Sequence, residues 1–151
     1  MKGSEGVYAE QKKDFFSNVI IKWMYKVNQE IIPLEVCVDQ YQPYYYAGAS
    51  GDYNSIHIDN EYAKKAGLPG IILQGLCTMA YVYLAVMRDE DPAKLKNFKV
   101  RFRSVVRPLD KITVKGTVSK IENSNVTFDL YAENQNGEQV ITNTTAILDM
   151  R

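Results

Sequence analysis

Residues 75–90, GLCTMAYVYLAVMRDE, are apolar over most of their length and decide how this chain folds. The run is rich in Leu, Met and Ala and has no proline or interior glycine, so it predicts one long helix. Because its apolar residues occupy nearly every face, we expect the helix to be buried on most sides. It begins at Gly75, shortly after the apolar piece Ile71–Leu73.

Beyond this helix the sequence changes to the alternating pattern of β-strands. The expected strands span 97–106, 111–122, 125–134 and 139–150. Asn136-Gly137 predicts a tight hairpin between the last two strands, since both residues accept the positive φ of such turns. The chain therefore ends in a sheet of long antiparallel strands.

Shorter elements are expected before the helix. They are a strand over 32–40, a helix over 41–50 that ends at Gly48 or Ser50, and a helix over 59–67. Asp59 or Asn60 can cap the second of these helices, and Gly67 can end it. One apolar helix followed by a long sheet indicates an α+β fold in which the sheet curls around that helix.

A chain of 151 residues is the size of one domain. We divide it into an N-terminal extension, 1–31, and the folded domain, 32–151. Apolar residues at three- and four-residue steps predict an amphipathic helix over 14–28 in the extension. A sheet of this kind leaves edge strands exposed unless it pairs with a second copy, so a dimer is expected.

Composition excludes several classes of function. The 18 basic and 18 acidic residues balance, which argues against a nucleic-acid or membrane-surface partner. No apolar run is long enough to span a membrane, and the N-terminus lacks the pattern of a secretory signal, so we expect a cytoplasmic protein. Cys37 and Cys77 are expected to be buried, reduced thiols, and without a Cys/His cluster no metal or other cofactor is predicted.

The only histidine of the chain lies in 50–59, SGDYNSIHID. Asp52 and His57 are five residues apart, a spacing that neither a strand nor a helix places on one face. The turn-forming residues around them predict a loop, which can aim both side chains at one point. An imidazole and a carboxylate together can take a proton from water and return it, and Asn54 can donate a hydrogen bond. The alternative is an ordinary polar turn with a structural histidine.

Gly75 is the second candidate, because it opens the long helix. Free N–H groups and the positive end of the helix dipole meet at a helix start. They can stabilise an oxygen that becomes negative during a reaction, and a glycine allows that oxygen to come close. The alternative is a plain glycine at a helix start.

Together the two segments resemble the hydratase-2 motif of the MaoC-like dehydratases, which are (R)-specific enoyl-thioester hydratases. In that family a pattern F/Y-A-x-x-S-G-D-x-N-P-I-H-x-D is followed by I-x-H-G-L/M-x-T. The matching residues here are Tyr46, Ala47, Ser50, Gly51, Asp52, Asn54, Ile56, His57, Asp59, Ile72, Gly75, Leu76, Cys77 and Thr78. The later stretch FKVRFRSVVRPLDKITVKGTV is also similar, so the resemblance covers roughly 32–150.

The resemblance implies a hot-dog fold, in which a long sheet wraps one central helix, assembled as a homodimer or a dimer of dimers. It also implies reversible hydration of a trans-2-enoyl thioester to the (R)-3-hydroxyacyl thioester, as in fatty acid metabolism, with the acyl group on CoA or an acyl-carrier protein. By the family pattern, Asp52 and His57 activate the water, Asn54 helps to orient it, and the Gly75 N–H holds the thioester oxygen.

Three positions depart from the family pattern: Ser55 stands for a proline, Gln74 for a histidine, and Tyr83 for a serine of the central helix.

Two functions other than hydration stay open. One is a non-catalytic hot-dog subunit that binds acyl thioesters or pairs with an active partner. The other, a thioesterase, is disfavoured because residues 75–87 of the central helix carry no carboxylate. Four basic residues form a row along one face of the expected strand 97–106 and the turn after it: Lys99, Arg101, Arg103 and Arg107. This row could bind the phosphates of CoA or an acidic carrier protein. Alternatively, it could be an ordinary solvated strand face.

Overall fold

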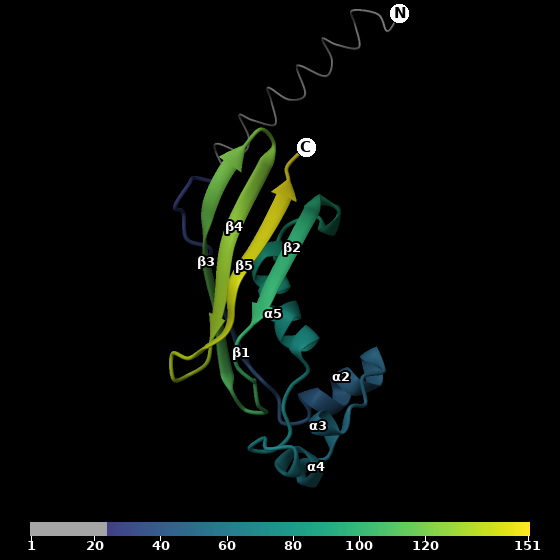
Figure 1. The fold of residues 1–151 in the computed structure, drawn as a ribbon. Coiled ribbons are helices and arrows are strands. Elements are labelled where there is room, and N and C mark those ends of the chain that lie inside the picture. The colour runs from purple at the N-terminus through teal and green to yellow at the C-terminus, as the bar shows by residue number, and fades with distance from the viewer. Residues whose placement is uncertain (1–23) are drawn as a thin grey trace, which may run out of the picture.

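Five antiparallel strands form one sheet in the computed structural model, which describes residues 24–151 (Figure 1). Their spatial order is β1-β3-β4-β5-β2. The strands are β1 (Leu34–Cys37), β2 (Leu95–Phe102), β3 (Lys111–Glu122), β4 (Asn125–Glu133) and β5 (Gln139–Asp149). The predicted meander is therefore confirmed, and β2 returns to lie beside β5 at one edge of the sheet.

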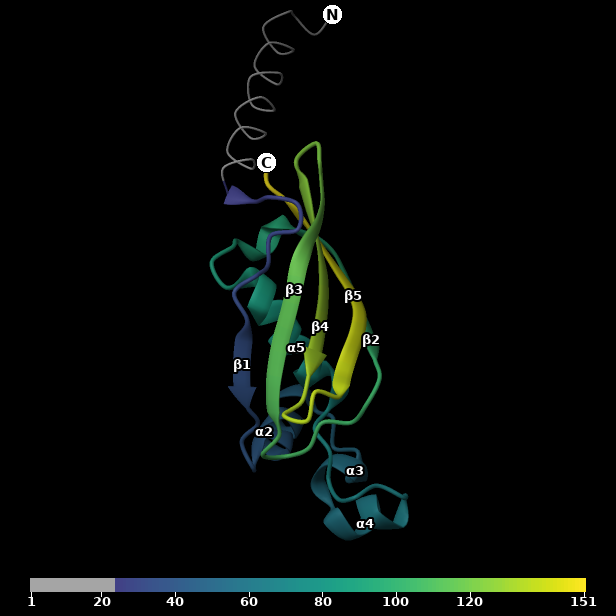
Figure 2. The same ribbon diagram turned by 90° about the vertical axis from the view of Figure 1, so that its left-hand side faces the viewer.

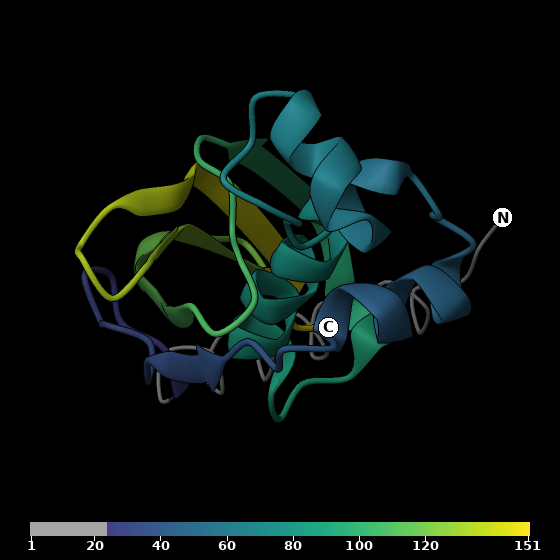
Figure 3. The same ribbon diagram turned by 90° about the horizontal axis from the view of Figure 1, so that it is seen from below.

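The helix α5 (Gly75–Met87) lies along one face of this sheet (Figure 2). Seen along its length, the sheet curls around the helix (Figure 3). This is the predicted α+β architecture, a hot-dog fold, in which a long antiparallel sheet wraps one central helix. The three short helices that precede α5 gather at the end of the sheet where α5 begins (Figure 1).

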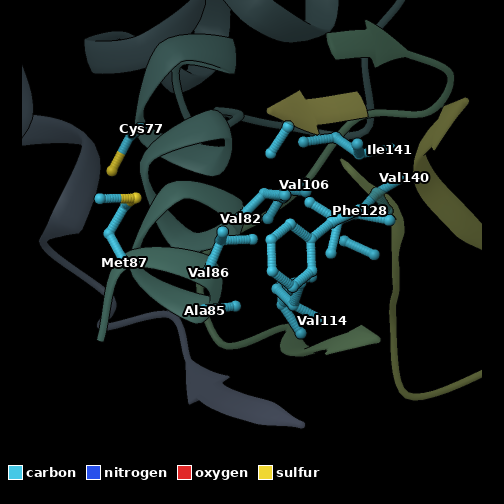
Figure 4. Packing of buried hydrophobic residues seen from close by; sticks show 14 of the residues in the cluster. Cys77, Val82, Ala85, Val86, Met87, Val106, Val114, Phe128, Val140 and Ile141 are labelled. Atoms are coloured by element: carbon cyan, nitrogen blue, oxygen red, sulfur yellow. The ribbon is translucent and has the colours of Figure 1, made fainter. Parts of the chain in front are cut away.

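The core fills the space between α5 and the sheet (Figure 4). Alternate residues of β3 and β4 face inward, among them Val114 and Phe128, and they meet Val82 and Val86 of α5. Full burial of one such side chain contributes about 1.5–3 kcal/mol. Apolar residues at every second position of the strands, together with the apolar face of α5, thus explain the core between helix and sheet.

Gly116 lets β3 and β4 approach closely where the sheet curves. A Cβ atom there would lie 2.5 Å from the Asp129 carbonyl oxygen and 2.5 Å from a methyl carbon of Leu130. Further along the sheet, Asn143 has φ 47°, and the register of β5 shifts there against both of its neighbours. Such a bulge bends the strand. It lies just past Val140 and Ile141, near the end of β2.

Three short helices connect β1 to α5. They are α2 (Gln42–Ser50), α3 (Ser55–Ile58) and α4 (Asn60–Lys65), and a 3-10 turn, η1 (Pro92–Lys94), follows α5. Asp59 caps α4 by accepting a hydrogen bond from Tyr62 N at 3.0 Å, as predicted. The prediction of a continuous loop over 51–59 is wrong at residues 55–58, because Asn54 caps a helical turn there.

The predicted hairpin at Asn136-Gly137 is confirmed, with Gly137 at φ 76°. The strand predicted over 97–106 is too long, because β2 ends at Phe102. The next two residues no longer follow a ladder, since Arg103 N and Ser104 N both donate to Val140 O. The expected burial of α5 on most sides is also incomplete: one sheet covers one side, and Leu76 and Leu84 stay exposed.

Cys77 is buried as expected, but the prediction of a buried Cys37 is wrong. Cys37 lies in the edge strand β1, where alternate residues face outward, and it shares the exposed face with Glu35. Both thiols are free. The mistake arises because an apolar sequence neighbourhood does not show which face of an edge strand is covered.

The helix predicted over 14–28 lies mostly outside the described residues. Its end, residues 25–28, is not helical, and Asn28 has φ 67°. From there the chain runs along β3: Asn28 N donates to Val118 O at 2.8 Å and Ile31 N to Gly116 O at 3.0 Å. The division at residue 31/32 stays a prediction. Across residues 24–151, none of the helices has the length and apolar character needed to cross a membrane.

Candidate active site

Asp52 is presented by a tight turn at the end of α2. Gly51 ends the helix in the left-handed region, at φ 79°, and its N–H donates to Ala47 O at 2.8 Å. Asp52 N then donates to Ser50 Oγ at 3.2 Å, and Asp52 Oδ1 accepts from Asn54 N at 3.3 Å. One carboxylate oxygen thus fixes the turn, which leaves Oδ2 to face outward from it.

His57 lies in the short helix α3, which follows the turn that carries Asp52. Asn54 Oδ1 accepts from Ile56 N at 3.3 Å and caps this helix. Only 7% of His57 is exposed. Its Nδ1 lies 2.8 Å from Ile72 O, in the connection that leads into α5. A carbonyl oxygen only accepts hydrogen bonds, so Nδ1 carries the proton. In the neutral ring Nε2 is therefore the basic nitrogen.

The basic nitrogen of His57 faces the free oxygen of Asp52. Nε2 lies 3.7 Å from Oδ2. Both atoms are acceptors when the ring is neutral, so they cannot bond to each other directly. A water about 2.8 Å from each could donate one hydrogen to Nε2 and the other to Oδ2. The geometry therefore suits a single polarised water molecule.

The start of α5 lies beside this pair. Gln74 O accepts from Cys77 N at 3.0 Å and from Thr78 N at 3.2 Å, which accounts for two of the first amides of the helix. The N–H groups of Gly75 and Leu76 lie ahead of these, at the end where the helix dipole is positive. The ring of Phe102 comes within 3.4 Å of where a Cβ of Gly75 would be.

His57 and Gly75 line the same cavity, of about 240 Å³. Thr78 and Phe102 form part of its wall, Arg103 lies at its side, and the rest is mainly apolar. A larger hollow of about 820 Å³ lies elsewhere, lined by β3, β4 and β5 residues such as Lys115 and Asp129. His57 lines the smaller cavity and not this hollow, so we place the chemistry in the smaller cavity.

Other ionisable groups near the cavity are held in their neutral forms. Burial raises the pKa of the Cys77 thiol, and its hydrogen-bonding contacts with Tyr81 and Gln42 lower that pKa in part. Burial also raises the pKa of Tyr81 and of Tyr46, and in Tyr46 the charges of Cys77 and Asp52 add to it. Cys77 is therefore a poor nucleophile. Across residues 24–151, no three His, Cys, Asp or Glu side chains converge as a metal site.

The structure brings three of the four predicted site residues together. Asp52 faces His57, and His57 shares a cavity with Gly75. Neither Asp52 nor Asn54 lines the cavity wall, but Asp52 meets His57, whereas the side-chain oxygen of Asn54 is used as a helix cap. Sequence reasoning missed Phe102 and the carbonyl of Ile72. No local signal marks either one, because both reach the site through tertiary packing.

Residues 26–140 match the model of the MaoC like domain family. The chain is 41% identical over 81 residues to "Enoyl-CoA hydratase 2, peroxisomal" of Arabidopsis thaliana, covering 50% of this chain and 26% of that protein. It is 35% identical over 107 residues to "Probable enoyl-CoA hydratase 2" of Dictyostelium discoideum, covering 69% and 35%. It thus spans only about a quarter to a third of these curated relatives.

Solved structures agree on the fold. An (R)-hydratase from Pseudomonas aeruginosa superposes with a TM-score of 0.72 at 22% identity, covering 82% of this chain and 81% of that one. A MaoC-like dehydratase from Phytophthora capsici gives 0.69 at 30% identity, covering 80% and 40%. With the family model matched over most of its length, this chain belongs to the MaoC-like domain family.

Proposed function

We propose that this chain is a hydro-lyase that adds water to trans-2-enoyl thioesters with (R) specificity, or runs the reverse dehydration. The observation that carries the proposal is the Asp52–His57 pair, 3.7 Å apart beside a cavity that also contains the start of α5. The names of the relatives support the same reaction. No metal or other cofactor is needed for this chemistry.

In this reaction Nε2 of His57 and Oδ2 of Asp52 hold one water and accept a proton from it as its oxygen attacks the β-carbon. The electrons of the double bond move toward the thioester oxygen, which becomes an enolate. The N–H of Gly75, at the positive end of α5, stabilises that negative oxygen. The pair then returns the proton to the α-carbon, so that one water is added across the double bond.

Besides capping α3, Asn54 can contribute to binding of the water or the substrate. Its Oδ1 is committed to Ile56 N, so its amide nitrogen is the group that can donate to the water or to the substrate. We retain Asn54 and Gly75 as substrate-binding residues and Asp52 and His57 as the catalytic pair.

Residence in the cytoplasm also stays a prediction, because the name of the Arabidopsis relative places that protein in the peroxisome.

We also propose that the protein works as a homodimer, or as a dimer of dimers. Among the described residues, β1 and β2 form the two edges of the sheet, and free edges favour pairing with another copy. On α5, Leu76 is 58% exposed and Leu84 52% exposed, an apolar surface that a second copy would cover. Sedimentation equilibrium of the purified chain tests this assembly, and a monomer at all concentrations would contradict it.

The proposed reaction is tested with a panel of trans-2-enoyl-CoA substrates of increasing chain length. We expect loss of the enoyl absorbance, with the (R)-3-hydroxyacyl thioester as product on chiral analysis. His57→Gln should lose this activity and keep the fold. A folded protein that binds acyl thioesters but hydrates none of them would instead support the non-catalytic subunit.

A further inference from the structure

The connection into α5, residues 72–74, holds both the ring of His57 and the turn that carries Asp52. Ile72 O accepts from His57 Nδ1 at 2.8 Å, and Ile72 N donates to Ile56 O at 3.2 Å. Leu73 N donates to Val106 O at 2.7 Å, which anchors the connection to the segment after β2. The backbone of this connection thus positions His57, and the side chain of its last residue, Gln74, reaches α2.

Gln74 is a buried polar side chain that reaches two other segments. Its exposed fraction is 1%. Its Nε2 donates to Pro43 O, in the first turn of α2, at 2.9 Å, and lies 3.5 Å from Asp52 O. Among the described residues, its Oε1 has no hydrogen-bond partner. An unpaired buried acceptor lowers stability, so the needs of folding alone do not explain this oxygen.

The turn that carries Asp52 has few other ties to the rest of the domain. The hydrogen bonds at Asp52 to Ser50 and Asn54 stay within two residues along the chain. Within residues 24–151, the Gln74 amide is the group that joins the backbone of Asp52 to a distant segment. Asp52 itself has a side chain that is 45% exposed, so packing alone does not hold it in place.

We propose that Gln74 is a positioning residue, which holds the turn at Asp52 so that its carboxylate and the imidazole of His57 face one water. The inference rests on the proposed hydratase function, and it adds to that function a residue that touches neither water nor substrate. Gln74 acts through the backbone of Asp52, while the neighbouring Ile72 carbonyl fixes His57. One connection thereby aligns both members of the pair.

Gln74→Met tests this role, because it keeps the length of the side chain and removes the amide donor. Gln74→His keeps an N–H donor and should restore function. Thr144→Val is the matched control: it removes another buried polar group, 1% exposed and hydrogen-bonded to Thr142 O, in a strand residue outside the cavity wall. If Gln74→Met does not fold, Gln74→Asn replaces it, since that side chain is one methylene too short.

We expect kcat of Gln74→Met on crotonyl-CoA to fall about 10- to 100-fold, the effect of misplacing a catalytic group by about 1 Å. KM should change by less than about twofold. The melting temperature should fall modestly, because Pro43 O loses its donor while the unpaired Oε1 is also removed. Gln74→His should recover most of the lost kcat. Thr144→Val should leave kcat unchanged.

A second readout does not depend on turnover. His57 is the only histidine, so its ring nitrogens give one assignable set of long-range ¹H–¹⁵N NMR signals. Gln74→Met should shift the Nε2 signal in the same direction as Asp52→Ala, which removes the carboxylate and adds no donor, and Thr144→Val should not shift it. Folded Gln74→Met with wild-type kcat and a wild-type spectrum would overturn the inference. If the wild type hydrates no substrate, the proposed function fails, and the NMR comparison alone decides the role of Gln74.

Discussion

Asp52→Asn is the most informative change at the site, because it removes one charge and almost no volume. In the proposed reaction His57 becomes an imidazolium once it has taken the proton from water. The Asp52 carboxylate stabilises that cation and accepts the second hydrogen of the water. An asparagine does neither in the same way, and its NH₂ can donate directly to Nε2, which blocks the basic nitrogen.

The size of the effect follows from the distance of 3.7 Å between Nε2 and Oδ2. Two unit charges at that separation attract by about 4.5 kcal/mol at an effective dielectric constant of 20, and by about 1 kcal/mol in bulk water. The Asp52 side chain is 45% exposed, so solvent screening places the value between these limits. We therefore expect kcat to fall by about one to three orders of magnitude, with KM little changed.

The assay is crotonyl-CoA hydration under saturating substrate, with circular dichroism to verify the fold. Asp59→Asn is the matched control, since it removes the same charge from the same segment. Asp59 caps α4, and asparagine caps equally well, so this variant should keep full activity and stability. Folded Asp52→Asn with more than about a third of the wild-type kcat would refute the reasoning, because such a small loss lies below the range worked out above.

The remaining predictions concern the carrier, the acid stability and the core. The double variant Arg101→Glu/Arg103→Glu should raise KM for the CoA thioester several-fold at low salt and less at high salt, because Arg103 lies at the cavity. The control is the same charge reversal at Lys111 and Lys120 of β3. Equal KM values for the two double variants would refute a role of the arginines in binding the carrier. Hydrogen bonds from Arg151 lower the pKa of Asp149 from 3.8 to about 2, so the stability from this contact is present above about pH 4 and is lost as the pH falls toward 2. Urea unfolding across that range should show the loss, and Asp149→Asn should flatten this part of the profile; an unchanged slope would contradict the assignment. Leu148→Ala, at a fully buried position, should lower the free energy of unfolding by about 2–5 kcal/mol, whereas Leu109→Ala, at a position that is 65% exposed, should lower it by less than about 1 kcal/mol. Equal losses in urea titrations of the two variants would show that Leu148 is not part of the cooperative core.

Much of the fold could be predicted from sequence, because its signals are local. The helix after Gly75, the caps at Asp59 and Gly67, and the hairpin at Asn136-Gly137 each depend on a few neighbouring residues. Errors occurred where distant parts of the chain decide the outcome. β2 ends at Phe102 because the next two amides both donate to Val140 O instead of continuing the ladder. Cys37 is exposed because, among the described residues, nothing covers that face of the edge strand.

The site divides in the same way. The sequence by itself determined which chemical groups are available: a single histidine, a carboxylate five residues before it, and a glycine that opens the central helix. Only the tertiary structure decided that Nε2 is the basic nitrogen, because that follows from the carbonyl of Ile72, 15 residues from His57 along the chain. It also decided that Phe102 closes over Gly75 and that Gln74 reaches Asp52. Hydrogen bonds and packing between segments far apart in sequence depend on the curvature and register of the whole sheet, and no local pattern of residues encodes them.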